Sequence, residues 1–406
     1  MNPLTTGLRR LAMLLLCGLL ATAGAAHAGA LTLVYSGNLN GELEPCGCTV
    51  DTDYGGLLRR ATFLDKLRAD GGAPVVVTTG GLLTADIGAD RIKARFILDG
   101  LAAIGYDAVG LQWADLVYGA GFLDQVALPY VASNWRGGQF PESAPIGRGE
   151  TRLRYFQWLD PAQSPMRGMP GDNDPAGSDT TALAAALAAA RAAGEITLLA
   201  TTLHAAEAVA QLPLQDVAVL LVAAAGETPG EPAWHAGTLV LAPGTRGMRL
   251  GLAELEPSGD GRVRLAAHRV VELTNAIPDA ARLAGWYSAY NDALRADYQR
   301  QVAERKLRAG GESGYLGARA CLGCHATAAK AWQGSRHAHA FATLEKVGKA
   351  FDPNCVVCHS VAYGKPGGFL GLDETAELAN VQCEACHGPG RDHVAAAGQS
   401  GYPGPQ

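Results

Sequence analysis

Three copies of one short cysteine motif lie near the C-terminal end of the 406-residue chain. Each copy has the pattern Cys-x-x-Cys-His, at residues 321–325, 355–359 and 383–387. Two thiols about one helical turn apart can add to the two vinyl groups of one porphyrin, and the imidazole that follows can bind the iron. The motifs therefore predict three covalently attached haem c groups. The predicted attachment and proximal-ligand residues are Cys321, Cys324 and His325; Cys355, Cys358 and His359; and Cys383, Cys386 and His387.

Zinc binding and disulfide bonding are the other common uses of such cysteines. Zinc sites combine paired Cys-x-x-Cys units or add a distant histidine pair, and disulfide bonds need no adjacent histidine. A histidine directly follows all three motifs in this chain. We therefore favour haem attachment over both alternatives.

Three further histidines, His337, His339 and His393, lie in the same region. Haems that transfer electrons usually carry two strong axial ligands, and a second imidazole can supply one of them. We expect these histidines to be distal iron ligands, with a surface position as the alternative for His339. A haem without a distal imidazole would instead offer an open coordination site to a small substrate.

The segment that carries the motifs is short for three porphyrins. A segment of about 90 residues has a radius of gyration of roughly 12 Å, so haems within it lie close together. Its apolar residues are few, and we expect the haems to replace much of the core, as metals do in other small domains. The haem-free segment is therefore predicted to be unfolded.

The N-terminus and the composition indicate an exported protein of more than one domain. Arg9 and Arg10 precede an apolar run at residues 11–20, and Ala-His-Ala at 26–28 completes the pattern of a secretory signal peptide, cleaved after residue 28. The apolar run is too short to span a bilayer, so we expect no membrane span in the mature chain and a periplasmic location. The net charge of -6 argues against a nucleic-acid partner.

Short apolar runs alternate with helical segments between residues 31 and 275, which predicts an α/β layered domain. The expected strands are residues 31–35, 74–78, 107–111, 196–201, 217–223 and 238–242. The expected helices of this domain are residues 56–69, 91–104 and 181–193. Antiparallel strands around a turn at 258–261 follow, and then a long helix at 279–308.

The C-terminal segment carries a distinctive order of short blocks around its motifs. Gly-Tyr-Leu-Gly occupies 314–317, Trp-x-x-Ser-Arg-His-Ala occupies 332–338, and Gln-Cys-Glu-x-Cys-His-Gly-Pro-Gly-x-x-His occupies 382–393. This order resembles the cytochrome c-554 family of multihaem proteins. The resemblance implies that His337 and His393 are distal ligands. The family typically has a fourth motif after this point, which is absent before Gln406, so we expect either a fragment or a shorter series of haems.

The N-terminal region resembles the 5'-nucleotidase branch of the calcineurin-like metallophosphatases, but its metal-ligand motifs have changed. The family's Asp-x-His-Gly appears as Asn-Leu-Asn-Gly at 38–41, and its Gly-Asp as Gly-Gly at 80–81. Its Gly-Asn-His-Glu appears as Gln-Trp-Ala-Asp at 112–115, and its Gly-His-x-His as Ala-Ala-Gly-Glu at 224–227. Only His204 remains, and one imidazole cannot hold a pair of metal ions. We therefore predict no phosphoesterase activity.

Cys46 and Cys48 are the two cysteines left after the motifs and the leader residue Cys17 are set aside. They lie in Glu-Pro-Cys-Gly-Cys at 44–48, and Gly-Gly-Leu-Leu-Arg-Arg follows at 55–60. A disulfide in so small a ring would be strained and easily reduced, which suits a redox site. A soft-metal pair and an ordinary local disulfide are the alternatives. A group of exported nucleotidase-like proteins has similar blocks, and this resemblance implies redox chemistry.

The sequence thus predicts a signal peptide at 1–28, a degenerate metallophosphatase-like α/β sandwich at 29–275, a helical connector at 276–313 and a mostly helical or irregular multihaem cytochrome c domain at 314–406. We expect a periplasmic electron carrier whose partners are redox proteins. The alternative is a redox enzyme that acts on a small nitrogen or sulfur compound, at a five-coordinate haem or at the N-terminal thiol pair. A third hypothesis is an active nucleotidase fused to a cytochrome.

Overall fold

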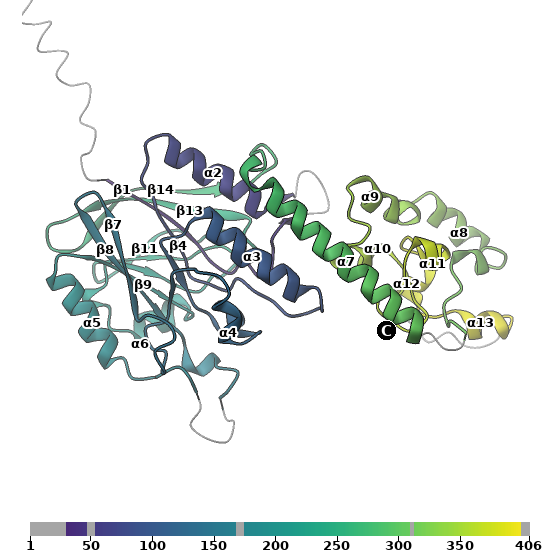
Figure 1. The fold of residues 1–406 in the computed structure, drawn as a ribbon, viewed down its shortest axis with the longest axis horizontal. Coiled ribbons are helices and arrows are strands. Elements are labelled where there is room, and N and C mark those ends of the chain that lie inside the picture. Colours follow the sequence, from purple (N-terminus) through teal and green to yellow (C-terminus); the bar gives the residue numbers. More distant parts are fainter. Residues whose placement is uncertain (1–29, 47–52, 168–173, 309–311, 399–406) are drawn as a thin grey trace, which may run out of the picture. The chain divides into compact units, whose positions relative to one another are not determined.

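The structure, a computed structural model, describes residues 30–46, 53–167, 174–308 and 312–398. The chain forms two compact units (Figure 1). The first unit comprises the residues up to Asp86 together with Ala94–Leu283. The second comprises Ile87–Lys93 and the residues from Ala284 onward.

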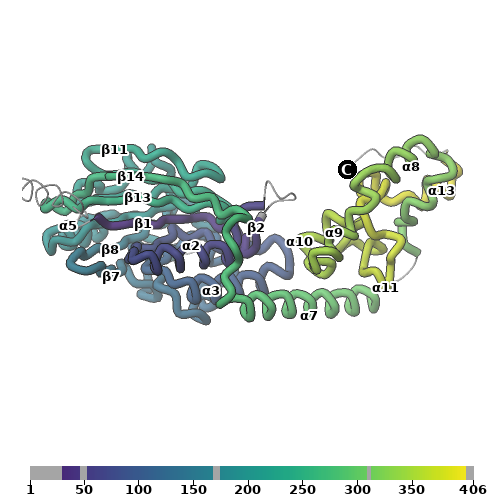
Figure 2. Tube along the Cα trace, turned by 90° about the horizontal axis from the view of Figure 1, so that it is seen from above, coloured from purple at the N-terminus to yellow at the C-terminus, as the bar shows by residue number. Residues whose placement is uncertain are grey.

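The first unit contains two six-stranded mixed sheets. In order along the first sheet, the strands are β14 (Val263–Glu272), β13 (Arg249–Pro257), β1 (Leu31–Ser36), β4 (Val75–Thr78), β5 (Ala108–Gly110) and β6 (Tyr130–Val131). In the second sheet they are β11 (Ala233–His235), β12 (Thr238–Leu241), β10 (Val219–Leu221), β9 (Ile196–Thr201), β8 (Thr151–Trp158) and β7 (Ser143–Arg148). The central strands run parallel, whereas β13, β14, β11 and β7 add antiparallel edges. Strands β14, β13 and β1 lie side by side in Figure 2.

The main core lies between the two sheets. Alternate residues of β1 and β4, such as Leu33 and Val77, share one cluster of 21 buried residues with Leu198 of β9 and Tyr155 of β8. Successive side chains of a strand point to opposite faces, so the remaining apolar residues of these strands need a second cover. Helices α5 (Thr181–Ala192) and α6 (Ala205–Gln211) supply it on the second sheet. Helices α2 (Leu57–Ala69) and α3 (Asp90–Ile104) follow β1 and β4 in the chain.

All six predicted strands and all three predicted helices of this region occur, with ends that differ by at most two residues. The antiparallel pair around residues 258–261 is also confirmed as β13 and β14. The sequence prediction missed the hairpin of β7 and β8. Pro145 and Gly147, which are uncommon inside strands, interrupt the apolar pattern of β7, and Arg152 and Arg154 alternate with the apolar residues of β8. Arg154 is satisfied by a 2.6 Å ion pair with Glu195, which no local pattern reveals.

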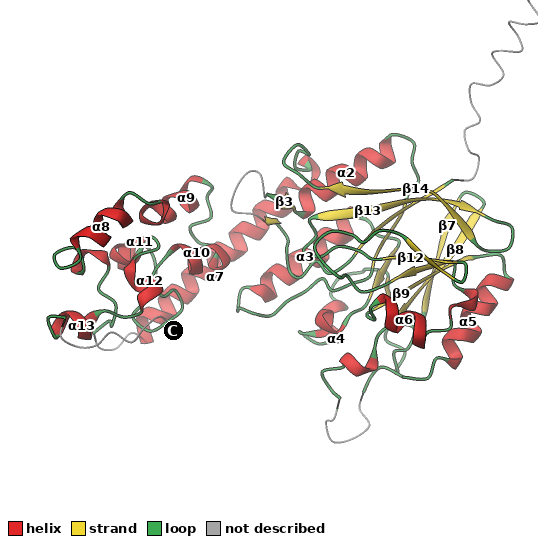
Figure 3. Cartoon of the chain, turned by 180° about the vertical axis from the view of Figure 1, so that it is seen from behind, coloured by secondary structure: helices red, strands yellow, loops and turns green. Residues whose placement is uncertain are grey.

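The second unit is mostly helical, as Figure 3 shows. It opens with α7 (Ala284–Arg308), which begins five residues later than the predicted start at 279. The shorter helices that follow are α8 (Ala326–Gln333), α9 (Ala340–Lys346), α10 (Pro353–His359), α11 (Leu372–Thr375), α12 (Cys383–His387) and α13 (Arg391–Ala395). Within the described ranges, no helix combines the length and apolar character needed to cross a membrane.

Candidate haem-binding site

The three motifs lie at the ends of short helices in the second unit. The second motif ends α10, which begins with Pro353 and is capped by the Asp352 carboxylate through a 3.0 Å bond from the Asn354 amide. The third motif forms the whole of α12, which ends at Gly388 with a φ of 81°. In the first motif, His325 caps the start of α8. Each pair of thiols is therefore held by about one turn of chain.

The cysteines share one pattern of exposure in all three motifs. The first cysteine of each motif, Cys321, Cys355 or Cys383, is half-buried, and the second, Cys324, Cys358 or Cys386, is exposed. None of these six cysteines forms a disulfide bond. Two unbridged cysteines followed by one imidazole, as each motif has them, are the donor set that a covalently attached porphyrin needs.

The imidazole of His359 is already oriented by a backbone group. Its Nδ1 atom lies 2.7 Å from the carbonyl oxygen of Ala340, which can only accept, so Nδ1 carries the proton and donates. The lone pair of the ring then lies on Nε2. Histidines that bind metals usually donate their other ring N–H to a carbonyl or carboxylate in this way. The geometry of His359 therefore fits an iron ligand.

His325 of the first motif lies beside His393 of α13. Their ring centroids are 6.1 Å apart and their planes differ by 23°. Two imidazoles that bind one metal ion from opposite sides, with metal–nitrogen bonds of about 2 Å, have centroids roughly 6 Å apart. The separation of this stacked pair agrees with that distance.

The first and third motifs are neighbours in space. Burial and, after it, the adjacent Cys383 thiol raise the pKa of Cys321 to about 11. The two thiols are also close enough to share a hydrogen bond. Groups attached at these two motifs would consequently lie next to each other.

A hydrogen-bond network joins the turn that carries His337 and His339 to the third motif. Both histidines are exposed residues of the 3-10 turn Arg336–His339. The Val381 amide donates to the carbonyl oxygen of His337 at 3.2 Å, and Trp332 Nε1 donates to the carbonyl oxygen of Val381 at 2.8 Å. This turn also leads directly into Ala340, which orients His359.

The apolar core of the second unit is small. Its described cluster contains seven buried residues: Phe341, Leu344, Val356, Val361, Phe369, Leu378 and Ala379. The cluster between the two sheets of the first unit contains 21. A cluster of this size agrees with the expectation that attached porphyrins complete the core.

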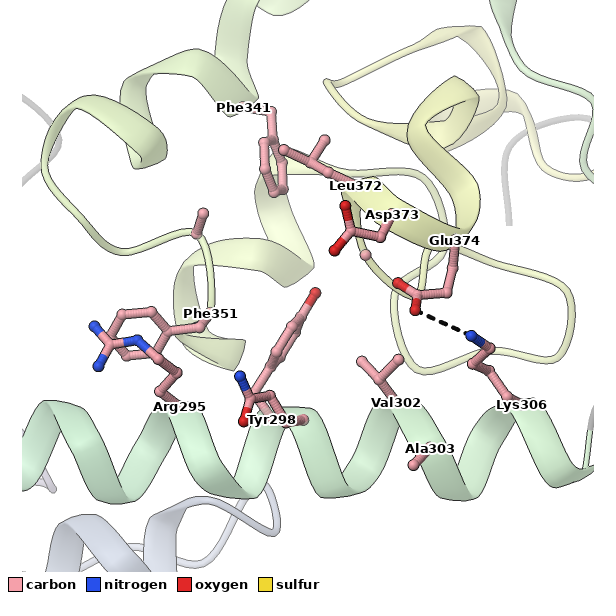
Figure 4. Close-up of a pocket in the computed structure, with 13 residues that line it drawn as sticks. Arg295, Tyr298, Val302, Ala303, Lys306, Phe341, Phe351, Leu372, Asp373 and Glu374 are labelled. Atoms are coloured by element: carbon pink, nitrogen blue, oxygen red, sulfur yellow. Dashed lines mark hydrogen bonds and ion pairs between the residues drawn. The ribbon is translucent and has the colours of Figure 1, made fainter.

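A separate pocket of about 450 Å³ lies between α7 and the short helices of the second unit (Figure 4). Tyr298 and Val302 project into it from α7, opposite Phe341 and Leu372. None of the motif residues lines it. Lys306 and Glu374, which both line the pocket, form a 3.2 Å ion pair. The guanidinium carbon of Arg295 lies over the ring of Phe351, 4.3 Å from the ring centroid. Helix α7 is thus packed against the segment that carries the motifs.

In the first unit, Asn38, which the resemblance places at an acidic metal ligand of the family, is joined to Gln112 by side-chain amide groups. The side chains of Asn38 and Gln112 exchange hydrogen bonds of 3.4 and 3.3 Å. Gln112 Nε2 also donates to the carbonyl oxygen of Thr79 at 3.0 Å. Asn38 has a φ of 46°, a left-handed conformation that asparagine tolerates better than most residues. A neutral amide pair therefore occupies this place, where the resemblance implies an acidic ligand in the family.

Asp115 anchors the loop that follows β4. Its fully buried carboxylate accepts backbone N–H bonds from Gly81 at 2.9 Å, Leu82 at 2.6 Å and Gln112 at 2.9 Å. Burial raises the pKa of Asp115 above the ordinary range of the group. From the sequence, Asp115 belongs only to a block that has lost its metal ligands, whereas in the structure it holds the loop.

The remaining candidate positions of the first unit are not gathered around that site. His204 is exposed at the start of α6, and Glu227 forms a 3.1 Å ion pair with Arg246. In the parts of the chain that the structure describes, no cluster of three or more His, Cys, Asp or Glu residues is placed to hold a metal ion. The absence of phosphoesterase activity stays a prediction.

Cys46 lies at the end of strand β2 (Pro45–Cys46), whose backbone pairs with β3 (Tyr54–Gly55). Cys48 lies outside the described residues. The predicted redox role of this thiol pair therefore stays a prediction.

Comparison with known families supports the assignment of the second unit. Residues 320–388 match the family described as cytochrome c554 and c-prime. This region is a cytochrome c554 domain. Cytochrome c-554 from Nitrosomonas europaea is 32% identical over 93 residues, a match that covers 19% of this chain and 40% of that protein. The chain therefore spans less than half the length of this curated relative, and the cytochrome c554 domain implies covalently bound haem c.

The first unit is similar in fold to 5'-nucleotidases and calcineurin-like phosphoesterases. The 5'-nucleotidase precursor from Thermus thermophilus matches with a TM-score of 0.56 and 18% identity, over 66% of this chain and 59% of that one. SoxB, a sulfate thiohydrolase from the same organism, matches with a TM-score of 0.53 and 16% identity, over 66% and 61%. The calcineurin-like phosphoesterase YfkN from Bacillus subtilis matches with a TM-score of 0.51 and 14% identity, over 65% of this chain and 97% of that one. At these identities the likeness shows a shared fold, as predicted, and nothing of the chemistry.

Proposed function

We propose that this chain is an exported c-type cytochrome that transfers electrons through three covalently attached haems. The observation that carries the proposal is the pair His325 and His393, whose 6.1 Å separation matches two axial ligands of one iron. Each haem, when bound, supplies reversible one-electron chemistry at its iron. The protein residues attach, orient and shield these groups.

The nine motif residues supply the covalent attachment and the proximal ligands. His325, His359 and His387 are the proximal ligands in this proposal, and the adjacent cysteines form the thioethers. His393 would hold the iron at the first motif together with His325, and His337 and His339 would hold the irons at the other two motifs. The contact between Cys321 and Cys383 supports close placement of the first and third haems, which favours electron transfer between them.

We propose that the first unit binds a redox partner in the periplasm and does not hydrolyse phosphoesters. The mutual amide bonds of Asn38 and Gln112 support this proposal, because Asn38 stands where the resemblance implies an acidic metal ligand and its neutral amide is bound by Gln112 instead. Export depends on the signal peptide that ends at Ala28. Purified protein with added manganese or zinc should release no phosphate from nucleotides, and release above a metal-free control would contradict this part of the proposal.

The intact mass of the mature protein tests the haem assignment directly. Expression with a complete cytochrome c maturation system should give a mass increase of three haems and a Soret absorbance. Replacing Cys355 and Cys358 together by serine should remove one haem from the mass. A colourless protein of unmodified mass would overturn the proposal.

Spectra of the reduced protein separate electron transfer from substrate chemistry. A carrier with six-coordinate haems should show unchanged spectra when carbon monoxide or cyanide is added. A ligand-induced change would reveal an open coordination site and would favour the alternative, a redox enzyme that acts on a small nitrogen or sulfur compound.

A further inference from the structure

Glu384, the residue after the first cysteine of the third motif, is a buried carboxylate held entirely by backbone groups. Only 5% of its surface is exposed. It accepts N–H bonds from Leu316 at 3.1 and 3.0 Å, from Gly317 at 2.8 Å and from Gly390 at 2.8 Å. The carboxylate therefore connects α12 to two loops that lie before the first motif and after the third.

The local backbone is adapted to this carboxylate. Gly317 has a φ of 79°, and a Cβ atom on Gly390 would lie 3.1 Å from Glu384 Oε1, so a side chain there would crowd the carboxylate. Both glycines let a backbone amide approach closely. The surrounding backbone is therefore shaped to bind the carboxylate of Glu384.

The negative charge of Glu384 is not neutralised by a neighbouring cation. Buried carboxylates are rare unless they are paired. No lysine or arginine among the described residues forms an ion pair with this one. Backbone N–H dipoles stabilise the ionised group, but they leave its net charge in place. A fixed negative charge of this kind acts over several ångströms in the protein interior.

The carboxylate lies close to the first motif as well as the third, because it accepts from the amides of Leu316 and Gly317 a few residues before Cys321. After burial and the Cys383 thiol, the charge of Glu384 also raises the pKa of Cys321. The second motif has no equivalent. The corresponding residue there is Val356, which is fully buried in the apolar cluster, and the first motif has Leu322.

We propose that Glu384 is a positioning residue that lowers the reduction potentials of the haems attached at the first and third motifs. The inference rests on the proposed function, because it requires haem at these motifs. An oxidised iron carries one more positive charge than a reduced iron, so a nearby fixed negative charge stabilises the oxidised form. The haem at the second motif is the internal reference.

The test is a redox titration of the haem-loaded full chain, followed by its visible spectrum. Glu384→Gln and Glu384→Leu both remove the charge, and the leucine variant copies the residue of the first motif. Glu384→Asp keeps the charge, and Glu377→Gln removes an exposed carboxylate of the same unit. The intact mass of every variant is measured first, so that missing haem is distinguished from a failed prediction about potential.

Two of the three midpoint potentials should rise in the neutral variants. Each rise should be about 59 mV, which corresponds to about a tenfold change in the equilibrium constant of a one-electron reduction. The rise should persist at high salt, because a buried charge is poorly screened. The aspartate variant and Glu377→Gln should match the wild type.

Unchanged potentials in a loaded neutral variant would overturn the inference. It would also be overturned if neither neutral variant attached haem while Glu384→Asp did, since Glu384 would then be a structural clamp only. A wild-type chain without haem would instead refute the proposed function itself.

Discussion

Replacing His393 with alanine tests the axial pair that supports the assignment of the site. Its ring centroid lies 6.1 Å from that of His325, close to the sum of two metal–nitrogen bonds of about 2 Å and the two distances from ring nitrogen to centroid. In the proposed arrangement, removal of His393 leaves the iron at the first motif with one protein ligand. One haem of three should change from low to high spin, so about one third of the low-spin signal should disappear.

Electron paramagnetic resonance of the oxidised protein measures this change, after the intact mass has confirmed that all haems are attached. Added imidazole should restore the low-spin signal. Asp392→Asn, an exposed change at the neighbouring position of α13, is the matched control and should leave the signal unchanged.

A double-mutant cycle shows which haem is affected. When Cys321 and Cys324 are replaced by alanine, the first haem is absent, and His393→Ala should then have no further effect on the spectrum. Full low-spin signal in a loaded His393→Ala protein would refute the reasoning, and so would a loss that persists without the first haem.

Two stability predictions follow from buried side chains. Asp115→Ala leaves three backbone N–H groups without an acceptor and should lower the free energy of unfolding of the first unit by about 3 kcal/mol. Burial raises the pKa of Asp115 in the folded protein. The part of the free energy of unfolding that depends on this pKa is fully present below the ordinary carboxylate pKa, and it is lost as pH rises through the raised pKa. The penalty should therefore shrink from acid to neutral pH in denaturant titrations, and a penalty that grows would contradict this sign. Phe369→Ala opens a cavity in the small core of the second unit and should cost about 3–5 kcal/mol, seen as a lower melting temperature of the haem-loaded unit, whereas Val347→Ala at an exposed position should change it little.

The sequence was most informative where one local pattern sufficed. Runs of apolar residues identified strands such as β9, because parallel strands that are buried on both faces read as continuous apolar segments. The hairpin of β7 and β8 escaped prediction, because its charges are satisfied by residues distant in the chain, such as Glu195. Local patterns cannot show such partners.

The same limit applies to the candidate site. Spacing alone identified the motif residues, because the chemistry requires both thiols and the imidazole within five positions. Neither the pairing of His325 with His393 nor the contact of Cys321 with Cys383 could be predicted, since each joins residues more than 60 positions apart. The role of Glu384 depends in turn on two loops that meet only in the folded chain.

The small apolar cluster of the second unit has a consequence for the supply of this protein in the cell. Seven buried residues form that cluster among those the structure describes, so we expect a chain that receives no porphyrin to open readily and to be cut by proteases. We therefore expect iron starvation to reduce the abundance of the protein after its synthesis, with its messenger RNA unchanged. Nutrient status would then set how many working molecules the cell keeps.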